Sequence, residues 1–172
     1  MAVLGDVSGK GLPAAMNVAL LVGTLRTLAE TTTDPAQILT GLNRHLLGRS
    51  KGFTTAIAVR IAPGGEADLA IAGHLNPYLN GRELVLEAAL PLGLTAEAAY
   101  ENTALMLAPD DILTLLTDGV LEARDVKTQE LFGFDRTLAI SAQPAAEIAA
   151  TAQRFGQDDD IAVLTLTRVV CV

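Results

Sequence analysis

The character of the sequence changes near residue 50, and this change constrains the fold more than any other feature. Before it, Pro13 in a first-turn position predicts a helix that runs to about Glu30, and apolar residues at helical spacing predict a second helix over about 35–48. After it, short runs rich in β-branched residues alternate with Pro, Gly and Asp. Helices in one block and antiparallel strands in another predict an α+β protein with sheet packed under helices.

The strand block is divided by turn residues. The expected strands are 2–6, 53–62, 67–73, 77–80, 83–87, 103–108, 111–117 and 161–169. Two hairpins are expected, one turning at Pro63-Gly64-Gly65 and one, between the strands 103–108 and 111–117, at Pro109-Asp110. Residues 119–150 are mixed, and a helix is expected at about 144–154. No repeat or linker is visible, so 1–172 is expected to form one domain.

The composition is that of a globular protein with an aliphatic core. Half of the 172 residues are hydrophobic and 19% are charged, whereas only 3% are aromatic and none is Trp. Twelve basic against twenty acidic residues give a net charge of −8, which argues against nucleic acid and anionic membranes as partners. A phosphorylated substrate remains compatible, because bound divalent cations reverse the local sign of charge.

The single cysteine and the N-terminal sequence indicate a cytoplasmic protein. Cys171 is the only cysteine, so an intrachain disulfide is excluded and a thiolate zinc site is not supported. The start MAVLGDVSGK lacks the basic and long apolar regions of a secretory signal. The longest apolar stretch, Leu12 to Leu25, is shorter than the roughly 20 residues of a membrane span, and we expect a helix buried inside the fold.

Three aspartates flank predicted strands. Asp6 follows AVLG, Asp118 follows DILTLLT, and Asp159 precedes IAVLTLTRV. If the last strand runs antiparallel to the other two, all three carboxylates lie at the same edge. Carboxylate oxygens suit Mg²⁺ and Mn²⁺, and the adjacent Gly5 and Gly119 allow close backbone approach. Aspartate beside a strand is also ordinary turn chemistry, so spacing alone leaves both interpretations open.

Three segments carry a family resemblance: GDVSGKGLPAAM (5–16), LLTDGVLEARD (115–125) and GQDDDIAVLTLTR (156–168). Supporting pieces are LNRHL (42–46), FTTAIAV (53–59), AGHLNP (72–77), PLGL (91–94) and LFGFDR (131–136). In this order they resemble the metal-dependent type-2C, or PPM, serine/threonine phosphatases. The closer resemblance is to the bacterial sporulation stage II protein E (SpoIIE)-like branch, which includes regulators of sigma-factor pathways.

The resemblance implies a four-layer α/β/β/α sandwich of two antiparallel sheets flanked by helices. It implies two Mn²⁺ or Mg²⁺ ions and hydrolysis of phosphoserine or phosphothreonine by a metal-activated water, with a phosphorylated regulator of the anti-anti-sigma type as substrate. Asp6 matches the aspartate that bridges both metals, Val7 matches a backbone carbonyl ligand, and Asp118 and Asp159 match the remaining carboxylates. Asp160 is a weaker candidate.

The sequence departs from the family pattern at two places. Ser8 stands where many eukaryotic relatives have a histidine, as is usual in the bacterial branch. Met1 lies only five residues before Asp6, so we expect an N-terminally truncated domain that lacks the family's first strands and their Gly-Gly-Asp-type ligand. The alternative function is therefore a non-catalytic module that binds a phosphoprotein or pairs with itself as a homodimer through exposed sheet edges.

A nucleotide-binding loop is a weaker interpretation of residues 5–11. Three residues instead of four separate Gly5 from Gly9, and Gly11 replaces the hydroxyl residue of the Walker pattern. Lys10 is either a phosphate-attracting group near the metals or a solvated loop charge.

Four other polar residues have structural interpretations that we favour. His74 and Asn76 follow a predicted strand and fit a turn better than a site. Arg124 and Arg136 are expected to be surface or ion-pair residues.

Overall fold

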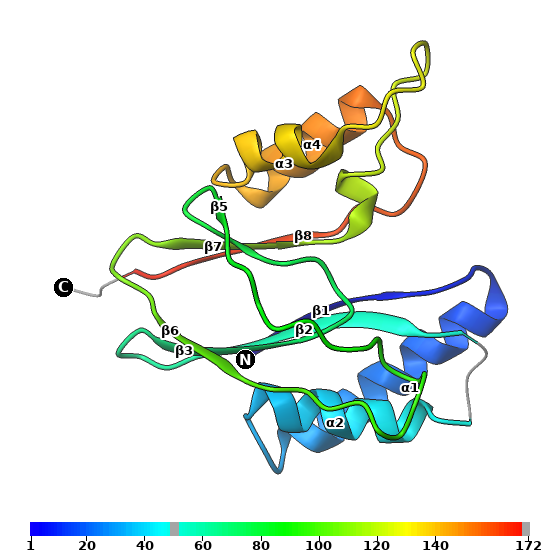
Figure 1. Ribbon diagram of the computed structural model, residues 1–172, viewed down its shortest axis with the longest axis vertical. Helices are drawn as coiled ribbons and strands as arrows, with labels where there is room; N and C mark the ends of the chain where they lie inside the picture. Colours follow the sequence, from blue (N-terminus) through cyan, green and yellow to red (C-terminus); the bar gives the residue numbers. More distant parts are fainter. Residues whose placement is uncertain (49–51, 170–172) are drawn as a thin grey trace. The chain divides into compact units, whose positions relative to one another are not determined.

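The computed structural model describes residues 1–48 and 52–169, so Cys171 lies outside the described residues. The chain forms two compact units. The first unit comprises Met1–His74 and Leu86–Met106, and the second comprises Leu75–Val85 and Leu107–Val172. Each unit contains one four-stranded antiparallel sheet and two of the α-helices, which confirms the α+β class (Figure 1).

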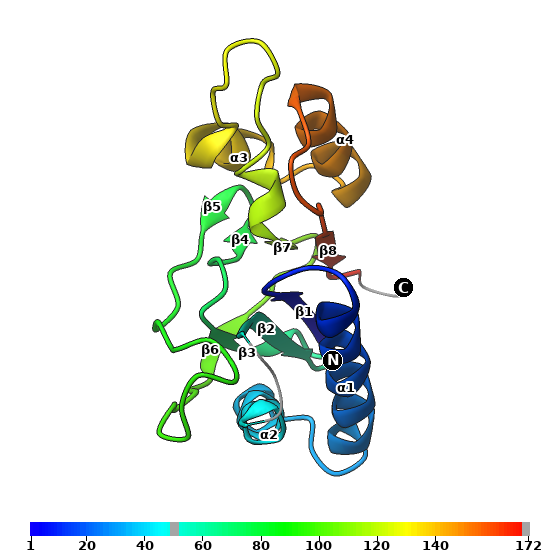
Figure 2. The same cartoon turned by 90° about the vertical axis from the view of Figure 1, so that its right-hand side faces the viewer.

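The sheet of the first unit has the strand order β1-β2-β3-β6. Its elements are β1 (Ala2–Val7), α1 (Leu12–Ala29), α2 (Pro35–Leu46), β2 (Thr54–Ile61), β3 (Glu66–Ala72) and β6 (Thr103–Met106). The predicted β2–β3 hairpin is confirmed, and the Gly65 N–H donates to the Ala62 carbonyl at 2.9 Å in its turn. Both helices lie beside one another on this sheet (Figure 2).

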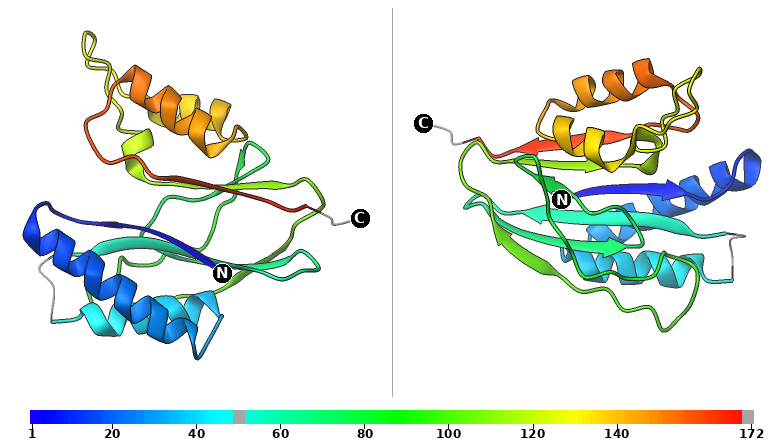
Figure 3. Two further views of the ribbon diagram at one scale, coloured as in Figure 1. Left: turned by 180° about the vertical axis from the view of Figure 1, so that it is seen from behind. Right: turned by 45° about the horizontal axis from the view of Figure 1, so that its top comes forward.

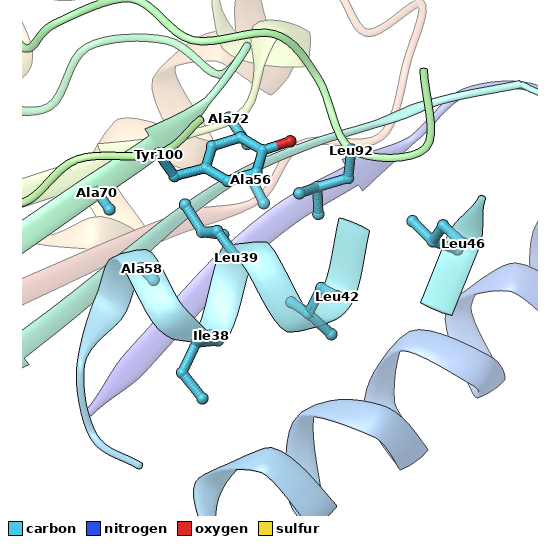
Figure 4. Packing of buried hydrophobic residues seen from close by; sticks show 10 residues of the cluster. All are labelled: Ile38, Leu39, Leu42, Leu46, Ala56, Ala58, Ala70, Ala72, Leu92 and Tyr100. Carbon is cyan, nitrogen blue, oxygen red and sulfur yellow. The ribbon is translucent and has the colours of Figure 1, made fainter. Parts of the chain in front are cut away.

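The core of the first unit forms where α2 meets small side chains of the sheet. Asp34 caps α2 by accepting the N–H of Gln37 at 3.1 Å, and Pro35 occupies its first turn. Large buried side chains of α2 face alanines of β2 and β3, whose small volume admits the helix (Figure 4). The residues of this cluster are Ile38, Leu39, Leu42, Leu46, Ala56, Ala58, Ala70, Ala72, Leu92 and Tyr100.

Helix α1 is more exposed than the sequence predicts. Only Thr24 is buried in it, whereas Leu12 is 74% and Met16 is 63% exposed, so the expectation of a buried helix is wrong. The physical reason is that α1 is apolar around its whole circumference but packs on one side only, against α2 and beside the outer strand β1. Among the described residues, α1 is the only helix long and apolar enough to cross a membrane by length and composition.

The sheet of the second unit has the strand order β5-β4-β7-β8 (Figure 2). Figure 3 shows its two longer strands, β7 in yellow-green and β8 in red, side by side next to the helices of the same unit. Its elements are β4 (Tyr78–Leu79), β5 (Arg82–Glu83), β7 (Ile112–Leu116), the 3-10 turn η1 (Asp118–Val120), α3 (Gly133–Ile140), α4 (Ala145–Phe155) and β8 (Val163–Thr167). Buried Val120, Phe132 and Ile148 join the helices to the end of β7. This packing fixes the end of the sheet at which Asp118 lies.

The predicted hairpin of 103–108 and 111–117 is wrong. Strand β6 pairs with β3, and β7 pairs with β4 and β8, so the two strands belong to different sheets. The predicted turn at Pro109-Asp110 does form, because the Asp111 N–H donates to the Ala108 carbonyl at 3.2 Å. The Asp110 N–H donates to the Arg168 carbonyl beyond the end of β8, at 2.9 Å, and not to β6. Residues 84–87 are not a strand, and α3 was not predicted.

Candidate metal centre

Thr117 fastens the end of β7 to the segment before β8. Its backbone N–H donates to the Ala162 carbonyl at 3.0 Å, and its Oγ1 accepts the Ala162 N–H at 3.0 Å. The same hydroxyl lies 3.3 Å from the Asp160 carbonyl, and the Thr117 residue is only 4% exposed. Asp118, the next residue, therefore lies beside the segment that carries Asp159.

Gly119 brings the two segments into direct contact. A β-carbon at this position would lie 2.3 Å from the Asp160 carbonyl oxygen, closer than real contacts allow. Only glycine permits this approach, which places η1 against the backbone of the Asp158–Asp160 segment. The Asp118-Gly119 pair thus has a steric role in addition to its carboxylate.

Asp118 and Asp159 lie at the same end of the second sheet. Strands β7 and β8 are antiparallel with Leu116 opposite Val163, so β7 ends where β8 begins. Both aspartates are exposed, and Asp159 Oδ1 accepts the Asp160 N–H at 2.8 Å. The antiparallel relation that the sequence argument assumed therefore holds for β7 and β8.

Asp6 and Val7 lie in the first unit, at the end of β1. Asp6 is half-buried and stands opposite Thr55 of β2, while Val7 stands opposite Thr54. Directly opposed residues present their side chains on the same face, so Thr55 adjoins Asp6. The next residue, Ser8, closes β1, because its Oγ accepts the Phe53 N–H at 2.8 Å.

Thr55 was not predicted to adjoin the site, and for His74 the sequence favoured a turn over a site residue. Thr55 Oγ1 lies 2.9 Å from His74 Nδ1. His74 therefore contacts the same β2 residue that stands opposite Asp6. The turn interpretation of His74 is therefore incomplete. The strand pattern around residue 55 does not reveal this contact, because it depends on a bridge between Ala56 and Gly73.

The donor chemistry at Asp118 and Asp159 fits a hard divalent cation. Their side chains supply oxygen ligands only, and Asp158 and Asp160 increase the negative potential of the same segment. Arg124 offsets part of this charge through an ion pair with Asp158, 3.2 Å from Nε to Oδ2. Within either unit, the described residues contain no group of three His, Cys, Asp or Glu that could hold a metal. The meeting of Asp6 with Asp118 and Asp159 stays a prediction.

Comparison with known structures identifies the fold as that of PP2C-type phosphatase domains. The SiaA-PP2C domain of Pseudomonas aeruginosa matches with a TM-score of 0.81 and 24% identity, over 96% of this chain and 74% of that chain. The PP2C phosphatase domain of SpoIIE from Bacillus subtilis, solved with a fragment of its regulatory domain, matches with a TM-score of 0.78 and 17% identity, over 96% of this chain and 53% of that chain.

The sequence places the chain more narrowly within this class. Residues 1–169 match the family described as stage II sporulation protein E, and the chain belongs to this SpoIIE family. The phosphoserine phosphatase RsbU of Bacillus subtilis (strain 168) is 30% identical over 129 residues, which cover 70% of this chain and 38% of RsbU. The family predicted from the motifs is thus confirmed, and the chain spans little more than a third of this relative.

Proposed function

We propose that this chain is the catalytic part of a metal-dependent phosphatase that hydrolyses phosphoserine or phosphothreonine in a protein. The observation that carries the proposal is the attachment of Asp118 to the Asp159 segment through Thr117 and Gly119. Two exposed carboxylates held at one sheet end provide a cation site in a family whose member RsbU is named a phosphoserine phosphatase.

We propose Mn²⁺ or Mg²⁺, two ions in the complete domain, as cofactor. Asp118 and Asp159 would hold metal in the second unit, and Asp6 with the Val7 carbonyl would do so from the first unit. When bound, such ions lower the pKa of a coordinated water and neutralise charge on the phosphoryl oxygens. The structure of RsbX, which shares the fold with a TM-score of 0.69 and 14% identity, is described as a complex with magnesium.

The residues described around Asp118 and Asp159 position the carboxylates, and a metal-activated water needs no protein nucleophile. Thr117 and Gly119 fix the backbone beside Asp118, and the β1–β2 register fixes Asp6. His45, one of two histidines, bonds within α2 to the Gly41 carbonyl at 3.0 Å. Water is therefore the proposed nucleophile, and its oxygen replaces the seryl or threonyl oxygen on phosphorus.

We propose a phosphorylated regulatory protein of the anti-anti-sigma type as substrate, in the cytoplasm. The resemblance to RsbU supports this choice. A solved Mycobacterium tuberculosis structure with the same fold contains RsbU and RsbW domains, which supports a partner-switching context. The net charge of −8 supports a protein partner over nucleic acid or an anionic membrane.

The test is hydrolysis of a phosphoserine peptide by the purified protein with and without Mn²⁺. We expect metal-dependent turnover in the wild type and a loss of at least about 100-fold in Asp118→Asn and Asp159→Asn, more than outer-shell changes cause. Asp135→Asn, an exposed acid in the first turn of α3, is the matched control and should retain activity. Wild-type turnover in either site variant would refute the assignment.

The second candidate function is self-association without catalysis. Strand β1 is the outer strand of its sheet, and the neighbouring α1 exposes Leu12, Met16 and Val22. An edge strand paired with its own copy is self-complementary about a two-fold axis, which favours a homodimer. Light scattering of the wild type and Met16→Glu tests this candidate, which predicts a dimer that the substitution converts to a monomer.

A further inference from the structure

Residues 125–130 form a loop that projects away from α3 and α4 (Figures 1 and 2). An antiparallel bridge between Arg124 and Leu131 closes its base. At its start, Asp125 Oδ1 accepts the N–H groups of Lys127 and Thr128, each at 2.8 Å, and these bonds lower the pKa of Asp125. We call residues 125–130 the projecting loop.

Arg124 contacts this loop and the Asp159 segment at the same time. Its Nη1 donates to the Gln129 carbonyl at 2.9 Å, and its Nε donates to Asp158 Oδ2 at 3.2 Å. Its backbone N–H also donates to the Gly156 carbonyl at 3.1 Å. One residue therefore joins the projecting loop to the start and the middle of residues 156–160.

Gly156 shows how closely this joint is packed. A β-carbon there would lie 1.9 Å from the Arg124 carbonyl oxygen, and the φ angle of Gly156 is 149°. The start of the 156–160 segment therefore rests on the Arg124 backbone, while its end is held by Thr117 and Gly119. Asp159 lies between these two attachments.

Arg136 provides an internal comparison. It forms an ion pair with Glu130 at 2.7 Å and donates to the Leu131 and Phe132 carbonyls at 3.0 and 3.2 Å. Its side chain also lies over the ring of Phe155, at 5.1 Å. Arg136 thus supports the projecting loop and α4, but none of these contacts involves residues 156–160.

We propose that Arg124 is a positioning residue for metal binding, which holds the Asp159 segment in its ligating conformation through Asp158 and Gly156. The proposal rests on the proposed function. Arginine suits this role because its planar group donates in two fixed directions, here to Gln129 and Asp158, which lysine cannot reproduce. Loss of groups that orient metal ligands typically lowers metal affinity about 10- to 100-fold.

Removal of Arg124 should change the affinity for a divalent cation in opposite directions, depending on whether Arg124 acts by positioning the segment or only by its charge. Arg124 is a cation near the carboxylates, so its removal should strengthen binding of a divalent cation if only charge matters. A positioning role predicts weaker binding. The Arg124–Asp158 pair is largely solvent-exposed, 39% and 61% for the two side chains, so neither role requires a large loss of stability.

The experiment is calorimetric titration of Mn²⁺ into wild type, Arg124→Ala, Arg124→Lys and the control Arg136→Ala. We expect affinity to fall about 10-fold or more in both Arg124 variants and less than about threefold in the control. Thermal unfolding by circular dichroism establishes that each variant is folded. Arg124→Lys keeps the charge, so it still tests the proposal if Arg124→Ala does not fold.

The outcomes distinguish the two proposals. Unchanged or stronger Mn²⁺ binding in Arg124→Lys and in folded Arg124→Ala, beside normal binding by the wild type, overturns the positioning role alone. A fall of the same size in Arg136→Ala also overturns it, because general loosening of the loop would then suffice. A wild type that neither binds Mn²⁺ nor hydrolyses the phosphopeptide overturns the proposed function and this inference together.

Discussion

Gly119 lies against the carbonyl oxygen of Asp160, where a β-carbon would have only 2.3 Å of separation. The contact joins two segments that are far apart in the sequence and that carry Asp118 and Asp159. This contact explains on steric grounds alone why a glycine follows Asp118. The partner atom is backbone, so it cannot turn aside as a flexible side chain would.

The substitution Gly119→Ala should therefore separate the two segments. We expect a loss of about 1–3 kcal/mol in the free energy of unfolding, typical of inserting a methyl group into a packed site, and weaker Mn²⁺ binding. Urea unfolding followed by circular dichroism measures the first effect and calorimetry the second. Gly23→Ala in α1 is the control: nothing lies within 4 Å of its β-carbon, so helix propensity should make it stabilising by about 0.5–1 kcal/mol.

Thr117→Val should destabilise the protein, because it removes the hydroxyl but keeps the side-chain shape. The Ala162 N–H would lose its acceptor in a partly buried place, at a cost of about 1 kcal/mol in unfolding free energy. Thr114→Val, three residues earlier in β7, is the matched control, since the buried Thr114 hydroxyl has no hydrogen-bond partner among the described residues. A control that loses as much stability as Thr117→Val would contradict this account.

Leu39→Ala tests the core of the first unit. Leu39 is fully buried among alanines that cannot expand to fill the space, so we expect a loss of about 2–5 kcal/mol. Met16→Ala in α1, 63% exposed, should change unfolding free energy by less than about 0.5 kcal/mol. Equal effects at both positions would mean that α1 is covered in solution.

The fold was predictable where local signals agree with packing. Helix α2 has both a cap at Asp34 and apolar residues at helical spacing, and its predicted extent differs from the observed one only at its end. Helix α1 has no such division between faces, so the sequence showed its length but not its exposure. The partners of β6 and β7 were mispredicted, because closeness in sequence favoured a hairpin and the register with β3 and β8 is a tertiary property.

The candidate site was predictable only in part. The sequence indicates that Asp118 and Asp159 lie at strand ends, whereas the antiparallel relation that brings these ends together was assumed and is supplied by the pairing of β7 with β8. Thr117 and Arg124 were not identified as supporting residues, because their partners lie 30 or more residues away in the chain. Arg124 was correctly expected to form an ion pair, but the pattern does not reveal which acid it contacts.

Alkaline pH should destabilise the protein through Tyr100. Burial raises the pKa of Tyr100 to about 12, so the folded state holds this proton more tightly than the unfolded state, whose phenol titrates near 10. This contribution to stability is complete below pH 10 and is lost as the pH rises from about 10 to 12. Absorbance at 295 nm can follow the ionisation of the tyrosine side chains, because the chain has two tyrosines and no tryptophan.

Tyr100→Phe isolates this contribution. The buried Tyr100 hydroxyl has no hydrogen-bond partner in the part of the chain that the structure describes, so the variant should be about as stable as the wild type at pH 7. Between pH 10 and 12 it should lose less stability than the wild type. The pKa of Tyr78 is also raised, mainly by burial, so the remaining absorbance change in Tyr100→Phe should still appear above pH 10 in the folded protein. A normal phenol titration in the folded wild type would contradict the burial of both rings.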